Sequence, residues 1–342
     1  MANGVSFALG TFARDGSGAF VGLVLEDLVF PLADALWRLQ PRASIDASSL
    51  LSLLDEWQRS YPVVARLAEA IAAEGPGRGP WKALAVDASS LKVLPPLRPR
   101  QLLCAGANYK RHVVELSLWM RRSQGLPADD AARAALEEEV LERQRRGGPY
   151  VFAALPGAIA GPYDDIVLPR EGEQHDWELE LAVVMGRRAW RVGVEEALDY
   201  VAGYTIANDI TTRDLVFRED VPRLGADWVR SKCRPTFFPL GPYLVPAAFV
   251  ADPLDLRLTL KLNGQVMQDE STSDMIFGVA ELVAYASSLA VLYPGDVLLT
   301  GSPAGNGAQY GRFLRPGDVL EGEITGLGRQ RNCCVAEGEA AR

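Results

Sequence analysis

Residues 175–186 read HDWELELAVVMG, and their alternation of apolar and acidic side chains decides which fold to expect. Successive side chains of a β-strand point to opposite faces, which gives this stretch one wholly apolar face. That face consists of Trp177, Leu179, Leu181 and Val183. The other face begins with acidic residues, including Glu178 and Glu180, before it turns apolar. The pattern predicts a strand inside a core, with two like charges that need an explanation.

The two glutamates lie on the same side of that strand, about 6.5–7 Å apart along the backbone. Carboxylates held that close in a β-rich core repel unless a proton or a cation lies between them, and a solvated edge strand is the alternative. A third carboxylate favours the cation, because residues 203–214, GYTIANDITTRD, read as a strand that ends at Asn208 and Asp209. Glu178, Glu180 and Asp209 would form an all-oxygen site for Mg²⁺, Ca²⁺ or Mn²⁺, whereas zinc prefers histidine or cysteine.

Histidine is scarce, since the chain contains only His112 and His175. This excludes three-histidine zinc sites. His112 precedes Glu115 by three residues, so on a helix both project from one face, and a histidine oriented by a glutamate can act as a general base for water. An ordinary exposed pair is the alternative. The sequence has no G-x-S-x-G elbow, no P-loop and no G-x-G-x-x-G after a strand.

The first part of the chain reads as a small α+β unit. Residues 19–32 alternate like paired strands, and residues 48–75 have helical periodicity with a glycine at the end. The proline-rich residues 93–101 read as a linker. We therefore expect a small N-terminal domain over residues 1–98 and a larger catalytic domain over residues 99–342.

The larger part begins with an expected strand over residues 102–109, followed by a helix over residues 110–122. Residues 125–148 predict a solvent-rich helix with an aspartate cap and late arginines. After residue 150, short strands alternate with Gly, Pro and Asp turns, and only residues 194–204 and 276–289 look helical. The predicted fold class is therefore α+β and β-rich, which differs from a doubly wound α/β sheet.

Composition restricts the classes of partner. The 342 residues are 48% hydrophobic with a net charge of −9, so the chain can bury a large core but lacks the basic surface that nucleic acids and anionic membranes attract. No apolar run reaches the roughly 20 residues of a membrane helix. The four cysteines form no C-x-x-C pair and the start has no signal-peptide pattern, so we expect a cytoplasmic protein.

From about residue 99 to 335, the chain resembles the fumarylacetoacetate hydrolase superfamily. The motifs that carry the resemblance follow in the family's order: CAGANYKRHVVE, GPYDDIVLP, DWELELAVVMG, DYVAGYTIANDITTRD, SKCRPTFFPLGP, NGQVMQDESTSDMIF, YPGDVLLTGSPAG and RPGDVLEGEITGLGRQRN. The resemblance implies a mixed β-sandwich or roll with a small N-terminal domain, commonly assembled as a homodimer.

The resemblance also implies a set of site residues. Glu178, Glu180 and Asp209 fall on the family's ligand positions for Mg²⁺ or Mn²⁺. His112 and Glu115 match a dyad, carried on a lid, that activates water. Lys232 matches a lysine that stabilises negative charge on the reacting oxygen of the substrate. Three further residues match positions near the substrate, namely Arg213, Thr300 and Tyr109.

The family's chemistry fits these residue types. A small organic acid chelates the metal through its carboxylate and its 2-oxo or enol oxygen, water activated by His112 attacks a second carbonyl, and a C–C bond breaks to leave an enolate. The cation and Lys232 lie where that charge develops. We expect a hydrolase of fumarylpyruvate- or acylpyruvate-type acids, as in aromatic catabolism. The alternatives are a decarboxylase, isomerase or hydratase of 2-oxo or 2-hydroxydienoic acids, and a degenerate member that only binds a ligand.

Three departures from the family pattern bear on the substrate. Val216 stands where many members have a glutamine that holds the substrate carboxylate, and Ala154 stands where many have a lysine. These losses indicate a less acidic, bulkier or differently held substrate. Residues 117–148 are longer than the same segment in compact members, and we hypothesise that they cap the pocket or extend the dimer contact. A neutral surface insertion is the alternative.

Overall fold

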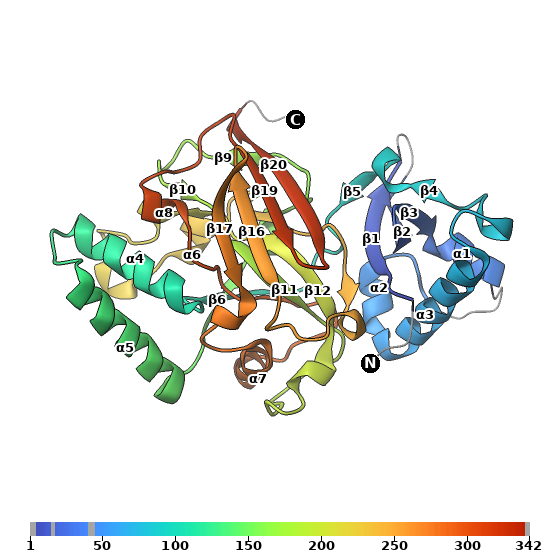
Figure 1. The fold of residues 1–342 in the computed structure, drawn as a ribbon, viewed down its shortest axis with the longest axis horizontal. Helices are drawn as coiled ribbons and strands as arrows, with labels where there is room; N and C mark the ends of the chain where they lie inside the picture. Colours follow the sequence, from blue (N-terminus) through green and yellow to red (C-terminus); the bar gives the residue numbers. More distant parts are fainter. Residues whose placement is uncertain (1–4, 15–17, 40–44, 339–342) are drawn as a thin grey trace.

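The computed structural model describes residues 5–14, 18–39 and 45–338 of the chain. Its first unit is a five-stranded sheet in the order β4-β3-β2-β1-β5, with three helices packed beside it (Figure 1). The strands are β1 (Ala8–Ala13), β2 (Phe20–Leu25), β3 (Leu28–Pro31), β4 (Val86–Asp87) and β5 (Lys92–Leu94). The helices are α1 (Leu32–Leu39), α2 (Leu50–Asp55) and α3 (Trp57–Glu74). The paired strands and the helices predicted within residues 19–75 are confirmed, although Glu56, with φ −121°, interrupts the helical stretch.

A six-stranded sheet in the order β15-β12-β11-β18-β6-β7 forms the centre of the molecule. Its strands are β6 (Leu102–Gly106), β7 (Tyr150–Ala154), β11 (Leu179–Met185), β12 (Val201–Asn208), β15 (Val245–Pro246) and β18 (Val297–Leu299). β11 lies in its interior and pairs antiparallel with both β12 and β18.

A five-stranded sheet in the order β17-β16-β19-β20-β9 faces the central sheet across the largest core. It contains β9 (Ile166–Leu168), β16 (Arg257–Leu262), β17 (Gln265–Ser271), β19 (Val319–Ile324) and β20 (Gly328–Ala336). Two short pairs complete the strands, β10 (His175–Asp176) with β13 (Thr211–Thr212), and β8 (Ile159–Ala160) with β14 (Phe238–Pro239). The predicted β-rich α+β fold with packed sheets is confirmed.

Both faces of β11 are buried, which explains why its acidic face turns apolar. Leu179, Leu181 and Val183 belong to the core between the two large sheets. Ala182 and Val184, on the opposite face, belong to a second core that includes the strands and helices of the N-terminal unit. Since the N-terminal unit and the central sheet share this core, the division into two domains near residue 98 stays a prediction.

Five helices surround the two large sheets (Figure 1). They are α4 (Lys110–Ser123), α5 (Asp130–Arg146), α6 (Trp228–Lys232), α7 (Val279–Leu289) and α8 (Gly307–Tyr310). α4 and α5 pack side by side as a hairpin, on the side of the body away from the N-terminal unit (Figure 1). Asp129 caps α5 by accepting the Ala132 N–H at 2.9 Å. The bounds of α4, α5 and α7 confirm the helices predicted over residues 110–122, 125–148 and 276–289. Short 3₁₀ turns are η1 (Gly79–Trp81), η2 (Ala88–Ser90), η3 (Pro156–Ala158), η4 (Ala197–Tyr200), η5 (Arg213–Leu215), η6 (Pro222–Leu224), η7 (Ala247–Phe249) and η8 (Thr272–Asp274).

The helix predicted over residues 194–204 is wrong. Only the single turn η4 forms there, and Val201 begins β12. Every residue of β12 is buried, and the strand is paired with β11 along its length. This pairing outweighs the local helical propensity, which is a weak preference compared with tertiary packing. Among the described residues, no helix is long and apolar enough to cross a membrane.

Candidate metal centre and active site

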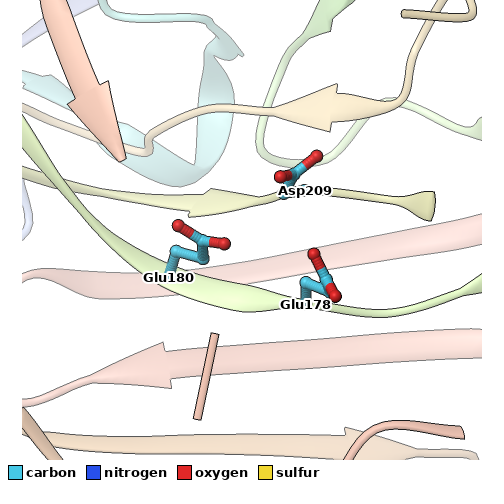
Figure 2. A group of neighbouring side chains, drawn as sticks. All are labelled: Glu178, Glu180 and Asp209. Carbon is cyan, nitrogen blue, oxygen red and sulfur yellow. The ribbon is translucent and has the colours of Figure 1, made fainter. Parts of the chain in front are cut away.

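Glu178, Glu180 and Asp209 converge at one end of the central sheet (Figure 2). The register of β11 and β12 opposes Leu179 to Asn208, so the residue before one strand meets the residue after the other. The Asp209 N–H donates to the Glu178 carbonyl at 2.9 Å and fixes this meeting point. One carboxylate oxygen from each of the three acids lies within 4.8 Å of the others, and all three side chains are at most 6% exposed. The alternative of a solvated edge strand is therefore excluded.

Two buried cations neutralise much of this negative charge. The Lys232 ammonium, at the end of α6, donates to Glu178 at 2.7 Å, to Asp209 at 2.6 Å and to the Thr211 hydroxyl at 2.6 Å. The Arg213 guanidinium donates to the other Glu178 oxygen at 2.5 Å. Among the described residues, no cation is paired with Glu180, which instead accepts the Gly301 N–H at 2.6 Å.

The pKa values of the three acids are pushed apart by this arrangement. Burial opposes ionisation of Glu178, but the charges of Arg213 and Lys232 outweigh it and lower the Glu178 pKa to about 2. Burial, together with the repulsion from Asp209, raises the pKa of Glu180 well above its usual value. Burial also raises the Asp209 pKa, to about 6, although Lys232 partly offsets it. The centre therefore retains a tendency to hold protons that a divalent cation would displace.

The donor set fits a hard divalent cation. All three side chains offer carboxylate oxygens, which Mg²⁺, Mn²⁺ and Ca²⁺ prefer. The second oxygen of Asp209 is buried and, among the described residues, has no hydrogen-bond partner. A buried carboxylate oxygen without a partner is costly unless a cation supplies the missing interaction.

A cavity of 230 Å³ opens above the three acids. Glu178, Glu180, Asp209, Arg213 and Lys232 form its charged end. Its other walls come from α4, β7, α6, residues 105–107 and Ser302, and their large apolar members are Val113, Leu116, Met120, Tyr150, Phe152 and Trp228. The cavity is thus polar at one end and apolar at the other, which is the usual character of a small-molecule site.

His112 and Glu115 lie on the same helix, α4, but only His112 lines the cavity. His112 lines the cavity, and burial lowers its pKa to about 4, so the imidazole is neutral near pH 7 and can accept a proton. Glu115 lies outside the cavity lining and accepts the Gly305 N–H at 3.2 Å. Over the described part of the chain, no hydrogen bond joins the two side chains. Their assignment as a water-activating dyad stays a prediction.

The remaining residues that the sequence singled out fall into three groups. Arg213 and Lys232 line the cavity, whereas Tyr109 and Thr300 do not. The Tyr109 side chain is fully buried, and the Thr300 hydroxyl donates to the Leu181 carbonyl at 3.0 Å, beneath the metal centre. A third group holds the positions that depart from the family pattern, because Ala154 and Val216 are buried outside the cavity lining.

Asp176 is a positioning residue that is not among the site residues predicted from the sequence. Its carboxylate is completely buried and accepts from the Arg213 Nε at 2.9 Å, the Gly307 N–H at 2.6 Å and the Ala308 N–H at 3.2 Å. Arg213 is therefore held between Asp176 and Glu178, and the loop that bears Gly307 is tied to the same point. The signal was present, since alternation already placed Asp176 on the acidic face.

The α4–α5 hairpin is fastened to the rim of the cavity. Arg143 of α5 donates to the carbonyl of Ala107, a cavity-lining residue, and its guanidinium lies 5.5 Å from the centre of the Phe277 ring. Gln144 donates to the Ile276 carbonyl at 3.1 Å. Residues 117–148 thus contact the site, and their role as a lid or dimer contact stays a prediction.

Comparisons with known proteins agree on one family. The family model described as "Fumarylacetoacetate (FAA) hydrolase C-terminal" matches residues 101–335. The mitochondrial oxaloacetate tautomerase FAHD2A of Bos taurus is 38% identical over 236 residues, which is 68% of this chain and 66% of that protein. The chain therefore spans just under two thirds of that relative.

Solved structures of similar fold cover nearly the whole chain. A probable 2-hydroxyhepta-2,4-diene-1,7-dioate isomerase from Mycobacterium abscessus is 29% identical with a TM-score of 0.67, and the match covers 96% of this chain and 98% of that one. A maleylpyruvate hydrolase from Sphingobium sp. SYK-6, solved with manganese(II) and pyruvate, has a TM-score of 0.67 at 23% identity, with 96% and 99% covered. At that identity the second likeness concerns the fold alone.

Proposed function

The chain belongs to the fumarylacetoacetate hydrolase superfamily, and on that premise we propose that it is a divalent-metal-dependent enzyme that interconverts the keto and enol forms of a 2-oxo acid. This gives more weight to the isomerase alternative than to C–C bond hydrolysis. The relative named as an oxaloacetate tautomerase, at 38% identity, supports this order. So does the lack of a hydrogen bond between His112 and Glu115 among the described residues, because keto–enol conversion needs a proton carrier but no activated water.

The observation that carries the proposal is the buried cluster of three carboxylates, in which one Asp209 oxygen has no hydrogen-bond partner among the described residues. We propose Mg²⁺ or Mn²⁺, with Ca²⁺ as a less catalytic substitute. The chemistry that such a cation supplies when bound is positive charge where the enolate oxygen develops.

The chain's own residues would perform the proton transfer. His112, neutral and exposed to the cavity, would take the proton from the carbon next to the 2-oxo group and pass it to the oxygen of the resulting enolate, and the reverse reaction would use the same two transfers in the opposite order. The Lys232 ammonium adds positive charge beside the same end of the cavity, and Asp176 keeps Arg213 oriented. The net change is the movement of one proton from carbon to oxygen.

The test is the rate at which enol absorbance decays for oxaloacetate, acetylpyruvate and phenylpyruvate, with Mn²⁺, with Mg²⁺ and with a strong chelator. We expect metal-dependent acceleration that Asp209→Asn removes, while Asp199→Asn, an exposed control on η4, keeps it. Rates that are equal with and without metal for every acid would exclude the proposed function.

Hydrolysis of an acylpyruvate remains the second candidate, because His112 faces the cavity and Glu115 lies one helical turn away. In that reaction water adds to the acyl carbonyl, the C–C bond breaks, and the products are pyruvate and a carboxylic acid. Product analysis of the same incubations separates the candidates: an intact acid with accelerated enol decay indicates tautomerisation, pyruvate indicates hydrolysis, and released CO₂ indicates decarboxylation. Intact acids with no acceleration of enol decay would favour a protein that only binds its ligand.

Assembly and location stay predictions. We propose a homodimer, which sedimentation analysis of the purified protein would test. The cytoplasmic location expected from the sequence receives no support from the bovine relative, which is named as mitochondrial.

A further inference from the structure

We propose that the site takes 2-oxo acids whose far end is an uncharged alkyl or aryl group, and that it discriminates against acids with a second carboxylate. The inference rests on the proposed function, because it assumes that the carboxylate and 2-oxo group of the substrate lie at the metal centre. It concerns the opposite end of the cavity.

An aromatic cluster forms the wall next to the charged end. The rings of Phe152 and Trp228 stack with centroids 4.8 Å apart, and Tyr150 lies 6.3 Å from Phe152 and accepts the Trp228 indole N–H at 2.8 Å. The Lys232 ammonium lies 5.8 Å from the Phe152 ring and 5.7 Å from the Trp228 ring. The group attached to the reacting carbons of a substrate would therefore meet aromatic rings directly beyond the metal centre.

The helix α4 extends this apolar wall. Val113, Leu116 and Met120 project from it into the cavity, one helical turn apart or nearly so. The remaining uncharged polar groups of the lining are His112, Ser117 and Ser302. The Ser302 hydroxyl oxygen already accepts hydrogen bonds from the side-chain amides of Gln268 at 3.1 Å and Asn306 at 3.2 Å.

No free cation faces the cavity to receive a second carboxylate. Among the described residues, its only cationic side chains are Arg213 and Lys232. Arg213 is paired with Asp176 and Glu178, and Lys232 is paired with Glu178 and Asp209. A carboxylate placed against the aromatic cluster would lose its water without gaining a counter-ion, whereas an alkyl or aryl group gains from the same burial. The preference for an uncharged end would therefore come from the unfavourable free energy of burying a second carboxylate without a counter-ion.

The test compares two acids that differ only at the far end, 5-methyl-2-oxohexanoate and 2-oxoglutarate, in which an isopropyl group replaces a carboxylate. Binding of each to the Mn²⁺-loaded protein is measured by calorimetry, so turnover is not required. We expect the isopropyl acid to bind at least tenfold more tightly. Equal or tighter binding of 2-oxoglutarate overturns the inference and leaves the proposed function standing. Binding of neither acid, with Mn²⁺ binding intact, overturns both.

A charge introduced into the wall should reverse the preference. Leu116→Arg places a cation on the α4 wall and is expected to raise affinity for 2-oxoglutarate and lower it for the isopropyl acid, changing the ratio at least tenfold. Ser123→Arg adds the same charge to an exposed position of the same helix and should leave the ratio unchanged. Met120→Arg serves as a second variant if Leu116→Arg fails to fold. An unchanged ratio in the folded variant would show that the tail does not contact this wall and would overturn the inference.

Discussion

The metal centre and the α4–α5 hairpin face the same cavity but are built in different ways. At the centre, Glu178, Asp209 and Lys232 are at most 6% exposed and are joined to one another by hydrogen bonds shorter than 3 Å. On α5, Val140 is the only buried side chain, and the helix is fastened to the rim chiefly through Arg143 and Gln144. One region is a buried charge network on two central strands, and the other is a largely exposed pair of helices.

The difference separates the residues that would bind the metal from the residues that position the rim of the cavity. Charges within a buried network depend on one another, so removing one leaves its partners uncompensated. Helices attached at a few points can shift at little cost, and the residues they carry are placed by those few contacts. Substitutions at the centre should therefore abolish metal binding, whereas substitutions on the hairpin should keep metal affinity unchanged and alter turnover.

The largest effect is expected for Glu178→Gln. The change removes a predicted metal ligand and the charge that faces both Lys232 at 2.7 Å and Arg213 at 2.5 Å. We expect Mn²⁺ affinity to fall by about 100-fold or more and the free energy of unfolding to fall by about 3–5 kcal/mol. Calorimetric Mn²⁺ titration and denaturant unfolding of the metal-free protein measure the two effects.

Glu195→Gln is the matched control, because that side chain is exposed and outside the cavity. It should bind Mn²⁺ like the unmodified protein. Unchanged Mn²⁺ affinity in Glu178→Gln would remove this residue from the ligand set and, with it, the contrast between the two regions.

Acidification should weaken metal binding at the centre. The pKa of Asp209 is raised to about 6 by burial, and that of Glu180 is raised well above its usual value by burial and by Asp209. A proton must leave each raised acid before a cation binds, so affinity falls as the pH decreases through about 6, by roughly tenfold per pH unit for each proton displaced. Mn²⁺ titrations between pH 5 and 8, in buffers of different ionisation enthalpy, give both the affinity and the number of protons released. An affinity independent of pH over this range would contradict the raised pKa values.

The convergence of the three carboxylates could be predicted from sequence because its information is local, whereas metal binding there stays a proposal. Alternation in residues 175–186 placed Glu178 and Glu180 on one face, and the end of the next strand supplied Asp209. Antiparallel pairing of β11 and β12 is a short-range arrangement of adjacent strands, and it is what brings the three acids together. Local information also identified α5 from its aspartate cap and its helix formers.

The rest of the cavity depends on contacts between residues far apart in the sequence, which the spacing of residues within a motif does not predict. Phe152 on β7 and Trp228 on α6 stack across 76 residues of sequence, and nothing in either motif marks them as a pair. The start of β12, residues 201–204, was included in the helix predicted over residues 194–204, because pairing with β11 and not local propensity decides its conformation. Glu115 shares a helix face with His112, yet the Gly305 N–H, far along the chain, holds its carboxylate elsewhere.

On the hairpin, Arg143→Ala should reduce turnover while keeping the metal. The variant loses the hydrogen bond to the Ala107 carbonyl and the contact with the Phe277 ring, so the cavity rim loosens. We expect kcat to fall by roughly tenfold, through misplacement of the rim, with Mn²⁺ affinity unchanged. Arg145→Ala is the control on the same helix, because its pairs with Glu138 and Glu142 are exposed. If both variants lose turnover equally, the overall charge of α5 determines the effect, and the contacts of Arg143 with Ala107 and Phe277 do not.

The smallest effect concerns how α5 is held on α4. Two neighbouring residues of α5 allow the loss of buried packing to be compared with a change at an exposed position. Val140 is 5% exposed within the large core, whereas Leu141 beside it is 38% exposed. Val140→Ala should lower the free energy of unfolding by about 1–2 kcal/mol, because it removes buried methyl groups and leaves a small cavity. Leu141→Ala should change it by less than about 0.5 kcal/mol, as expected for a surface substitution. Denaturant unfolding of both variants measures this difference. A Leu141→Ala loss as large as that of Val140→Ala would mean that the exposed face of α5 is covered in solution, as the proposed homodimer would allow.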